Sequence, residues 1–170
     1  EHMTKFINQS EQLMKLTKIV PSSKRIIGLR KNVEFQSLAK DGGRTMGRSD
    51  IVILGDEWGQ IRGPNDDFVD ALTSSQGAWG DKSLQIVIST QAATDADMLS
   101  TWIDDAQRSG DPKIVCHLYS AKEGCSLLDE KQWGLANPAM GIFRSKEDLH
   151  EQLTQAERLP TMESSARNLL

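Results

Sequence analysis

The chain has 170 residues, a length that suits one well-cored domain and is short for two. Hydrophobic residues make up 38% and charged residues 26%, fractions of a globular protein that exclude collagen-like and disordered classes. The net charge of −4 is uneven, because residues 1–50 hold ten Lys and Arg against five acids and the rest hold ten against nineteen. The basic portion permits a nucleic-acid contact, and on charge alone a solvated basic face is the simpler explanation.

Several features exclude other classes of protein. The longest apolar runs, Ile51–Leu54 and Ile86–Ile88, are far too short to cross a bilayer, so we expect no membrane contact. Cys116 and Cys125 lack the ligand spacing of a zinc site, and we expect reduced thiols. The first three residues, Glu-His-Met, are expected to be a cloning remnant, which leaves residues 4–170 as a single domain.

Hydrophobic periodicity predicts helices and strands in alternation. In chain order the expected elements are a helix over 8–19, a hairpin of strands over 24–30 and 33–39, a loop over 40–50, a strand over 51–54, a helix through 66–72, a strand over 84–89, a helix over 95–108, a strand over 113–119, and helices over 129–136 and 145–158. Asn65 or Asp66 is expected to cap the helix through 66–72, and Ser145 the last helix. After residue 50 this rhythm predicts an α/β domain with a mostly parallel sheet. Such sheets bind ligands at the carboxyl ends of their strands.

A pair of acids stands at one such end. The run IVILGDEWG, residues 51–59, places Asp56 and Glu57 directly after a buried strand. In a nucleotide hydrolase the first carboxylate holds Mg²⁺ through its water shell, and the second polarises the water that attacks the γ-phosphate. Two alternatives stay open on this pattern: solvated turn residues, and a metal nuclease, for which the chain offers no obvious third acid.

Polar residues follow the next buried strand at the same edge. They are Ser89, Thr90 and Gln91. In many nucleotide-driven motors a polar residue at this position senses the γ-phosphate and couples its loss to movement of the substrate. The alternative is a plain strand-to-helix turn in which Thr94 or Asp95 caps the following helix.

One segment imitates a phosphate-binding loop. GGRTMGRS, residues 42–49, fits G-x-x-x-x-G-K-[ST] except that Arg48 replaces the lysine. A phosphate-binding loop must open a helix whose amides complete the anion site, whereas Asp50 and a strand follow here at once. Arginine is also not equivalent to lysine in this role. We therefore expect no phosphate-binding loop in this chain.

Several ordered blocks resemble a known family. The runs SLAKDGGRTMGRSDIVILGDEW, FVDALTSSQGAW and LQIVISTQA, with WGLANP at 133–138, resemble the ATPase domain of phage large terminases. Those motors package double-stranded DNA into procapsids. The resemblance covers residues 20–170 and implies part of a P-loop NTPase-like three-layer sandwich, without the Walker A loop or the nuclease domain.

The resemblance also implies roles and partners. Asp56 matches the Mg²⁺ carboxylate, Glu57 the catalytic glutamate, and Ser89, Thr90 and Gln91 the coupling motif. Mg²⁺ is the implied cofactor and ATP the substrate. The implied partners are double-stranded DNA, the portal protein, the terminase small subunit and further copies in a ring, in the host cytoplasm. We expect the isolated chain to be inactive.

One position departs from the family pattern and another matches it. Gly55 stands where an apolar residue is expected before the acid pair, which could loosen or redirect the strand end. Asn137-Pro138 matches a family signature and is expected to stop a helix. Two other functions remain open: a helicase-like nucleic-acid motor, and a non-catalytic domain that binds DNA or a capsid partner.

Overall fold

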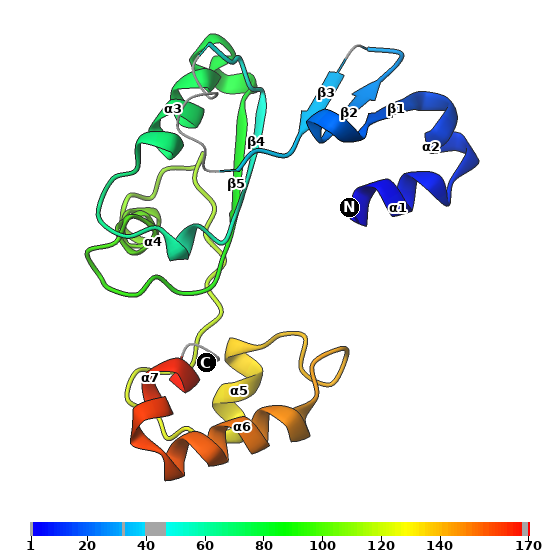
Figure 1. Cartoon of the computed structure of the whole chain (residues 1–170). Helices are drawn as coiled ribbons and strands as arrows, with labels where there is room; N and C mark the ends of the chain where they lie inside the picture. Colours follow the sequence, from blue (N-terminus) through cyan, green and yellow to red (C-terminus); the bar gives the residue numbers. More distant parts are fainter. Residues whose placement is uncertain (1, 32, 40–46, 168–169) are drawn as a thin grey trace. The chain divides into compact units, whose positions relative to one another are not determined.

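Two short helices and a three-stranded antiparallel sheet form the start of the chain (Figure 1). The computed structural model describes residues 2–31, 33–39, 47–167 and 170. The elements are α1 (His2–Asn8), α2 (Glu11–Leu16), β1 (Thr17–Val20), β2 (Arg25–Gly28) and β3 (Val33–Gln36). They belong to one compact unit, Glu1–Arg48, and the rest of the chain belongs to a second, Ser49–Leu170. Single-domain boundaries of 4–170 stay a prediction.

The N-terminal sheet corrects one expectation and confirms another. The single helix expected over 8–19 is wrong at both ends, because Gln9 and Ser10 separate α1 from α2, and the chain leaves the helix after Leu16 to form β1. Three of the four residues of β1 are β-branched, a composition that favours strands, and their backbone pairs with β2. The predicted hairpin is confirmed with shorter strands, since Gly28 of β2 pairs with Val33 of β3.

A two-stranded parallel sheet organises the first part of the second unit. It consists of β4 (Val52–Asp56) and β5 (Leu84–Ile88), with α3 (Asp67–Ser75) in the crossover and α4 (Met98–Arg108) after β5. Asp56 pairs with Ile88, so both strands end at one edge. Asp66 caps α3 as predicted, because its carboxylate accepts hydrogen bonds from two amides at the helix start.

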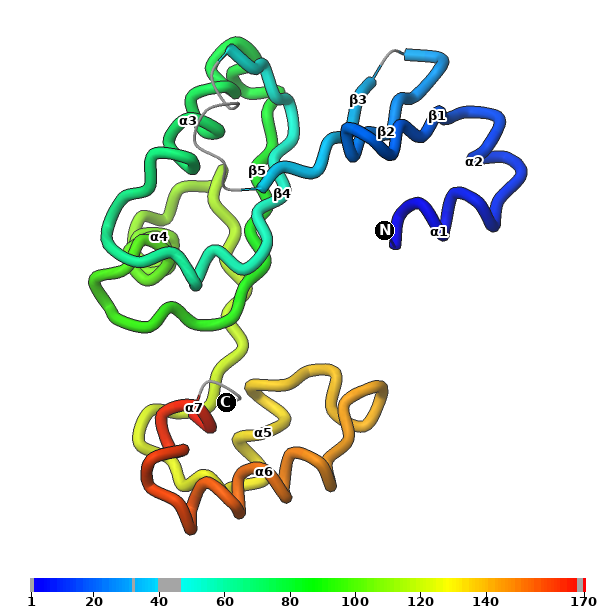
Figure 2. The backbone as a smooth tube through the Cα atoms, viewed as in Figure 1, coloured from blue at the N-terminus to red at the C-terminus, as the bar shows by residue number. Residues whose placement is uncertain are grey.

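The two faces of this sheet differ. Helices α3 and α4 lie on one side of β4 and β5 (Figures 1 and 2), and Ile53 is only 5% exposed. On the other side the alternate residues are apolar but open, with Leu54 60% and Ile88 69% exposed. We call this the bare face; it consists of Val52, Leu54, Leu84, Ile86 and Ile88. Parallel sheets normally have both faces covered.

The third strand expected over 113–119 does not form. Residues 109–120 contain neither helix nor strand, and Val115 is 76% exposed. The apolar composition of this segment favours a strand, but a strand needs a partner. In the described part of the chain, β4 and β5 pair only with each other, and the segment pairs with neither.

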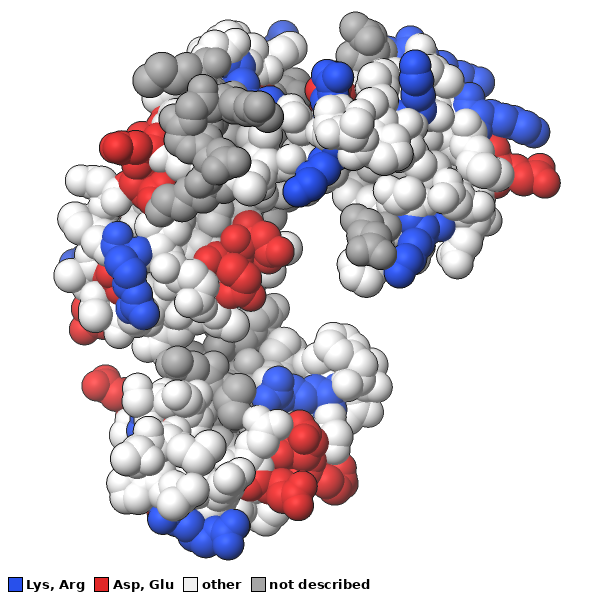
Figure 3. Space-filling model, viewed as in Figure 1, with Lys and Arg blue, Asp and Glu red and all other residues white. Residues whose placement is uncertain are grey.

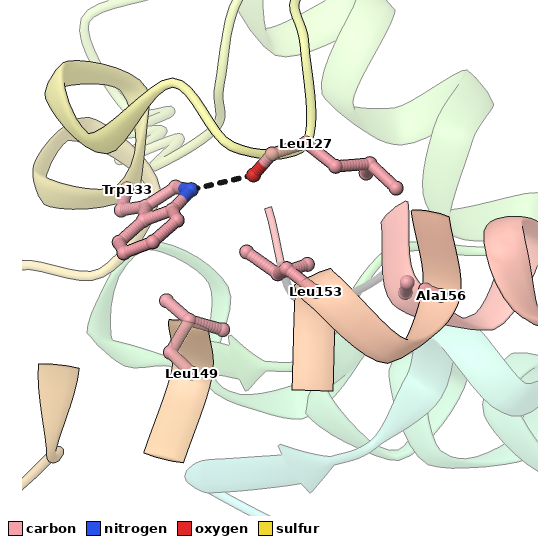
Figure 4. Close-up of a cluster of buried hydrophobic side chains, with 6 residues drawn as sticks. Leu127, Trp133, Leu149, Leu153 and Ala156 are labelled. Carbon is pink, nitrogen blue, oxygen red and sulfur yellow. Dashed lines mark hydrogen bonds between the residues drawn. The ribbon is translucent and has the colours of Figure 1, made fainter. Parts of the chain in front are cut away.

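Three helices enclose a separate core near the end of the chain. They are α5 (Glu130–Ala136), α6 (Lys146–Arg158) and α7 (Glu163–Arg167). Leu149 and Leu153 of α6 point toward Trp133 of α5 (Figure 4), and all three side chains are 0–1% exposed. The Trp133 indole N–H donates to the Leu127 carbonyl at 2.7 Å, so the core has no unsatisfied indole donor.

The ends of these helices follow the sequence signals. Ser145 caps α6 by accepting from the Asp148 amide at 3.1 Å. Helix α5 stops at Ala136, before Asn137-Pro138, as predicted. The helices expected over 129–136 and 145–158 are therefore confirmed. Among the described residues, no helix has the length and apolar composition needed to span a membrane.

Candidate functional site

The acid pair lies where the sequence predicted it, at the carboxyl end of β4. Asp56 is the last residue of the strand, and both acids are exposed. The Glu57 amide still donates to the Ile88 carbonyl at 2.9 Å, which extends the ladder by one bond. Glu57 then adopts a left-handed conformation, with φ 54° and ψ 37°. For a residue with a Cβ this conformation costs about 1–2 kcal/mol, so the surrounding structure must enforce it.

Gly55 and Trp58 explain how the turn is enforced. The left-handed Glu57 leads into a 3₁₀ turn, Trp58–Gln60, which folds the Trp58 indole back onto Gly55. A Cβ at residue 55 would overlap that indole, so only glycine fits. Trp58 is 6% exposed and meets Trp102 of α4 edge to face, at 5.7 Å between ring centroids. The sequence pattern did not single out Trp58, whose packing explains why residue 55 is glycine.

The polar residues after β5 meet the loop after β4. The Thr90 hydroxyl donates to the Glu57 carboxylate at 3.0 Å. The Ser89 hydroxyl accepts from the Gly59 amide at 2.8 Å. A side chain at residue 59 would overlap the Thr90 carbonyl, which explains the glycine. Gln91 follows with an exposed side chain. The structure thus joins Glu57 with Thr90 directly and places Asp56 beside the end of β5.

Asp97 ties the same two loops together farther from the sheet. Its carboxylate accepts from the Gly63 amide at 2.7 Å and from the Thr94 amide at 2.8 Å, and Arg62 lies 3.7 Å away. The Gly63 hydrogen bond, with those of Thr94 and the charge of Arg62, holds the pKa of Asp97 below its usual range, and burial opposes the shift. The sequence pattern offered Thr94 and Asp95 as caps here and did not single out Asp97. The only local indication of Asp97 was a second acid, two residues after Asp95, directly before α4.

Known proteins that resemble this chain match it over nearly its whole length. No family model matches the chain. A curated relative, the terminase large subunit of Enterobacteria phage HK97, is 49% identical over 165 residues, which are 97% of this chain and 32% of the relative. The crystal structure of the HK97 bacteriophage large terminase matches with a TM-score of 0.92 at 49% identity, over 98% of this chain and 34% of that one. The chain is homologous to a segment of a phage terminase large subunit.

The chain spans about a third of the length of the relatives it matches. The family resemblance expected from the sequence is thereby confirmed. The fold is confirmed as mixed α/β with a small parallel sheet.

The false phosphate loop, residues 42–49, lies partly outside the described residues, which exclude 40–46. In the described remainder, the Arg48 guanidinium donates to the Gln36 side chain at 2.8 Å. Residues 49–51 are not helical, and β4 begins at Val52. The prediction that a strand and not a helix follows this segment is confirmed, so the helix end that a phosphate loop requires does not follow Ser49.

The two carboxylates at this edge of the sheet are ligands of the kind that Mg²⁺ prefers. Mg²⁺ keeps several waters in proteins and binds through one or two carboxylates plus substrate phosphates. Asp56 and Glu57 are exposed carboxylates at a strand end, which leaves room for such a hydrated ion. Within the described residues, this edge of the sheet included, His, Cys, Asp and Glu form no group of three or more that could hold a metal, so the acid pair stands without a third such ligand there.

Proposed function

We propose that the chain is part of the ATP-hydrolysing motor of a phage large terminase, which drives double-stranded DNA into procapsids in the host cytoplasm. The observation that carries the proposal is the contact between Glu57, after β4, and Thr90, after β5. It brings a carboxylate and a hydroxyl together at the ligand-binding edge of a parallel sheet. The 49% identity to a large terminase over nearly the whole chain supports the same function.

The residues have distinct roles in this proposal. Asp56 would hold Mg²⁺ through water, and Glu57 would orient and polarise the water that attacks the γ-phosphate of ATP. Bound Mg²⁺ would neutralise charge on the phosphates during transfer. Ser89, Thr90 and Gln91 would sense the γ-phosphate. The Thr90–Glu57 hydrogen bond supports this coupling, because a movement of the Glu57 side chain would displace Thr90 in the loop after β5.

The open apolar side chains of the bare face support a nucleotide site that is completed by another part of the large subunit. Five apolar side chains on β4 and β5 lie open, although parallel sheets normally have both faces covered. We propose that a further part of the large subunit covers this face, completes a P-loop three-layer sandwich and supplies the phosphate-binding loop. The relatives are about three times as long as this chain, which leaves ample length for it.

DNA, the portal protein, the small subunit and further copies in a ring are the proposed partners. The charge distribution supports a nucleic-acid contact: ten of the twenty Lys and Arg lie in the unit Glu1–Arg48. Figure 3 shows many of these basic side chains over that unit. The same observation favours the second candidate function, a non-catalytic domain that binds DNA or a capsid partner.

Nucleotide binding and turnover test the proposal. Mg²⁺-ATP is offered to the 170-residue chain and, in parallel, to the full-length large subunit. We expect only the full-length protein to bind and hydrolyse ATP, because the phosphate-cradling amides lie outside this chain. Failure of both proteins would contradict the motor and favour the binding domain, which filter binding of a DNA duplex by the chain would then measure.

A further inference from the structure

Two pairs of hydrogen bonds connect the loop after β4 with the loop after β5. Nearest the sheet, Thr90 donates to Glu57, and Ser89 accepts from the Gly59 amide. Farther out, Asp97 accepts from the Gly63 amide, and the Met98 amide donates to the Gly63 carbonyl at 2.8 Å. The two loops therefore run side by side from the sheet edge to the start of α4.

Asp97 is the most buried polar group in this connection. It is 4% exposed, and each of its oxygens accepts a short amide hydrogen bond, one from each loop. It precedes α4 but its side chain does not cap that helix, because it accepts no hydrogen bond from the first amides of α4. The Asp97 carboxylate therefore uses its hydrogen bonds to join the two loops and not to cap α4.

We propose that Asp97 is a positioning residue that locks the loop after β4 to the loop after β5 and thereby holds Glu57 against Thr90. Glu57 is strained in its left-handed conformation, so the loop must be held at its far end as well as at the strand. Ser89 and Trp58 hold the near end, and Asp97 holds the far end through Gly63. The effect of this lock on ATP turnover rests on the proposed function, whereas the lock itself does not.

The chemistry of the lock requires a carboxylate. A carboxylate only accepts hydrogen bonds, which matches two amide donors. In Asp97→Asn one oxygen becomes an amide group that donates, so it meets the Gly63 or the Thr94 amide with the wrong polarity. The substitution conserves shape and breaks one side of the lock.

Hydrogen exchange of the 170-residue chain tests the lock without ATP. We expect Asp97→Asn to speed exchange of the Gly63 and Thr94 amides about tenfold. The Gly59 amide, which bonds Ser89 and not Asp97, is expected to speed up as well. The matched control is Asp104→Asn on α4, whose carboxylate makes only an exposed ion pair with Arg108. It should leave all three amides unchanged.

The Gly59 amide distinguishes a lock from a local contact. Acceleration confined to Gly63 and Thr94, with Gly59 unchanged, would overturn the proposal. If Asp97→Asn also speeds exchange in α6, the fold itself has loosened, and Asp97→Ser then decides. Serine is a favoured residue before a helix and retains one acceptor, so α4 is preserved while one side of the lock opens. Unchanged Gly59 exchange in that variant would equally overturn the proposal.

Turnover by the full-length protein tests the consequence. We expect Asp97→Asn to lower kcat about tenfold to hundredfold with little change in the KM for ATP, because misplacement of Glu57 affects the reaction more than binding. An unchanged kcat alongside faster Gly59 exchange would overturn the positioning role. If Glu57→Gln itself leaves turnover unchanged, the proposed function fails, and the exchange result still reports on the lock.

Discussion

The C-terminal helices and the β4–β5 sheet differ in how completely they bury their apolar side chains. Trp133, Leu149 and Leu153 close around one another and are 0–1% exposed, so these helices supply their own core. The sheet buries only one face and leaves the other open, with Leu54 60% exposed. The helices thus form a core of their own, whereas the sheet that carries the acid pair has the open face that the proposed further part of the large subunit would cover.

Truncation of the helical core should produce the largest effect. We expect Leu153→Ala to lower the free energy of unfolding by about 2–5 kcal/mol, because it removes a fully buried side chain and leaves a cavity. The control is Leu135→Ala on α5, at a side chain that is 59% exposed. Urea denaturation measures both variants. Equal, small effects would show that the helices do not form an independent core.

Filling the space beside Trp58 should produce an intermediate effect. We expect Gly55→Ala to destabilise the chain by about 1–3 kcal/mol and to shift tryptophan fluorescence, because the new methyl group displaces the indole. Gly77→Ala is the control, since a Cβ at residue 77 meets nothing within 4 Å. If alanine at 55 is tolerated as well as alanine at 77, the indole does not need the glycine.

The bare face should give the smallest effect in the isolated chain. We expect Leu54→Ala to change its stability by no more than about 0.5 kcal/mol, as for other exposed positions. In the full-length protein the same substitution should cost about 2–5 kcal/mol, because the face would then be covered. Ile53→Ala, on the buried face, is the comparison and should be costly in both. Thermal denaturation measures both variants, each in the isolated chain and in the full-length protein. If Leu54→Ala leaves the stability of the full-length protein unchanged, the bare face is not covered there.

Local signals in the sequence predicted much of this fold. Asp66 and Ser145 stand before amphipathic runs, and both cap helices as expected. The strand at 113–119 was wrong because an apolar run shows only that a segment could pair, and pairing depends on a partner. The end of the first helix was wrong because Thr17–Val20 fit a helical period and their β-branched residues fit a strand better.

The site was predictable where it depends on strand ends. Glu57 and Thr90 follow neighbouring parallel strands, and that arrangement alone brings them to one edge. The left-handed turn at Glu57 and the fit of Trp58 over Gly55 depend on three-dimensional packing that no spacing rule encodes. Asp97 escaped notice because its partners, the Gly63 and Thr94 amides, are backbone groups that every residue type carries.

The most direct test of the central claim is ATP turnover by the full-length protein with Glu57→Gln, beside Glu151→Gln at an exposed position of α6. If Glu57 polarises the attacking water, Glu57→Gln should lower kcat by about 10²- to 10⁴-fold, with ATP binding retained and the fold intact. Glu151→Gln should turn over ATP like the unaltered protein. Equal turnover by the two variants would contradict the account and remove the acid pair from the reaction.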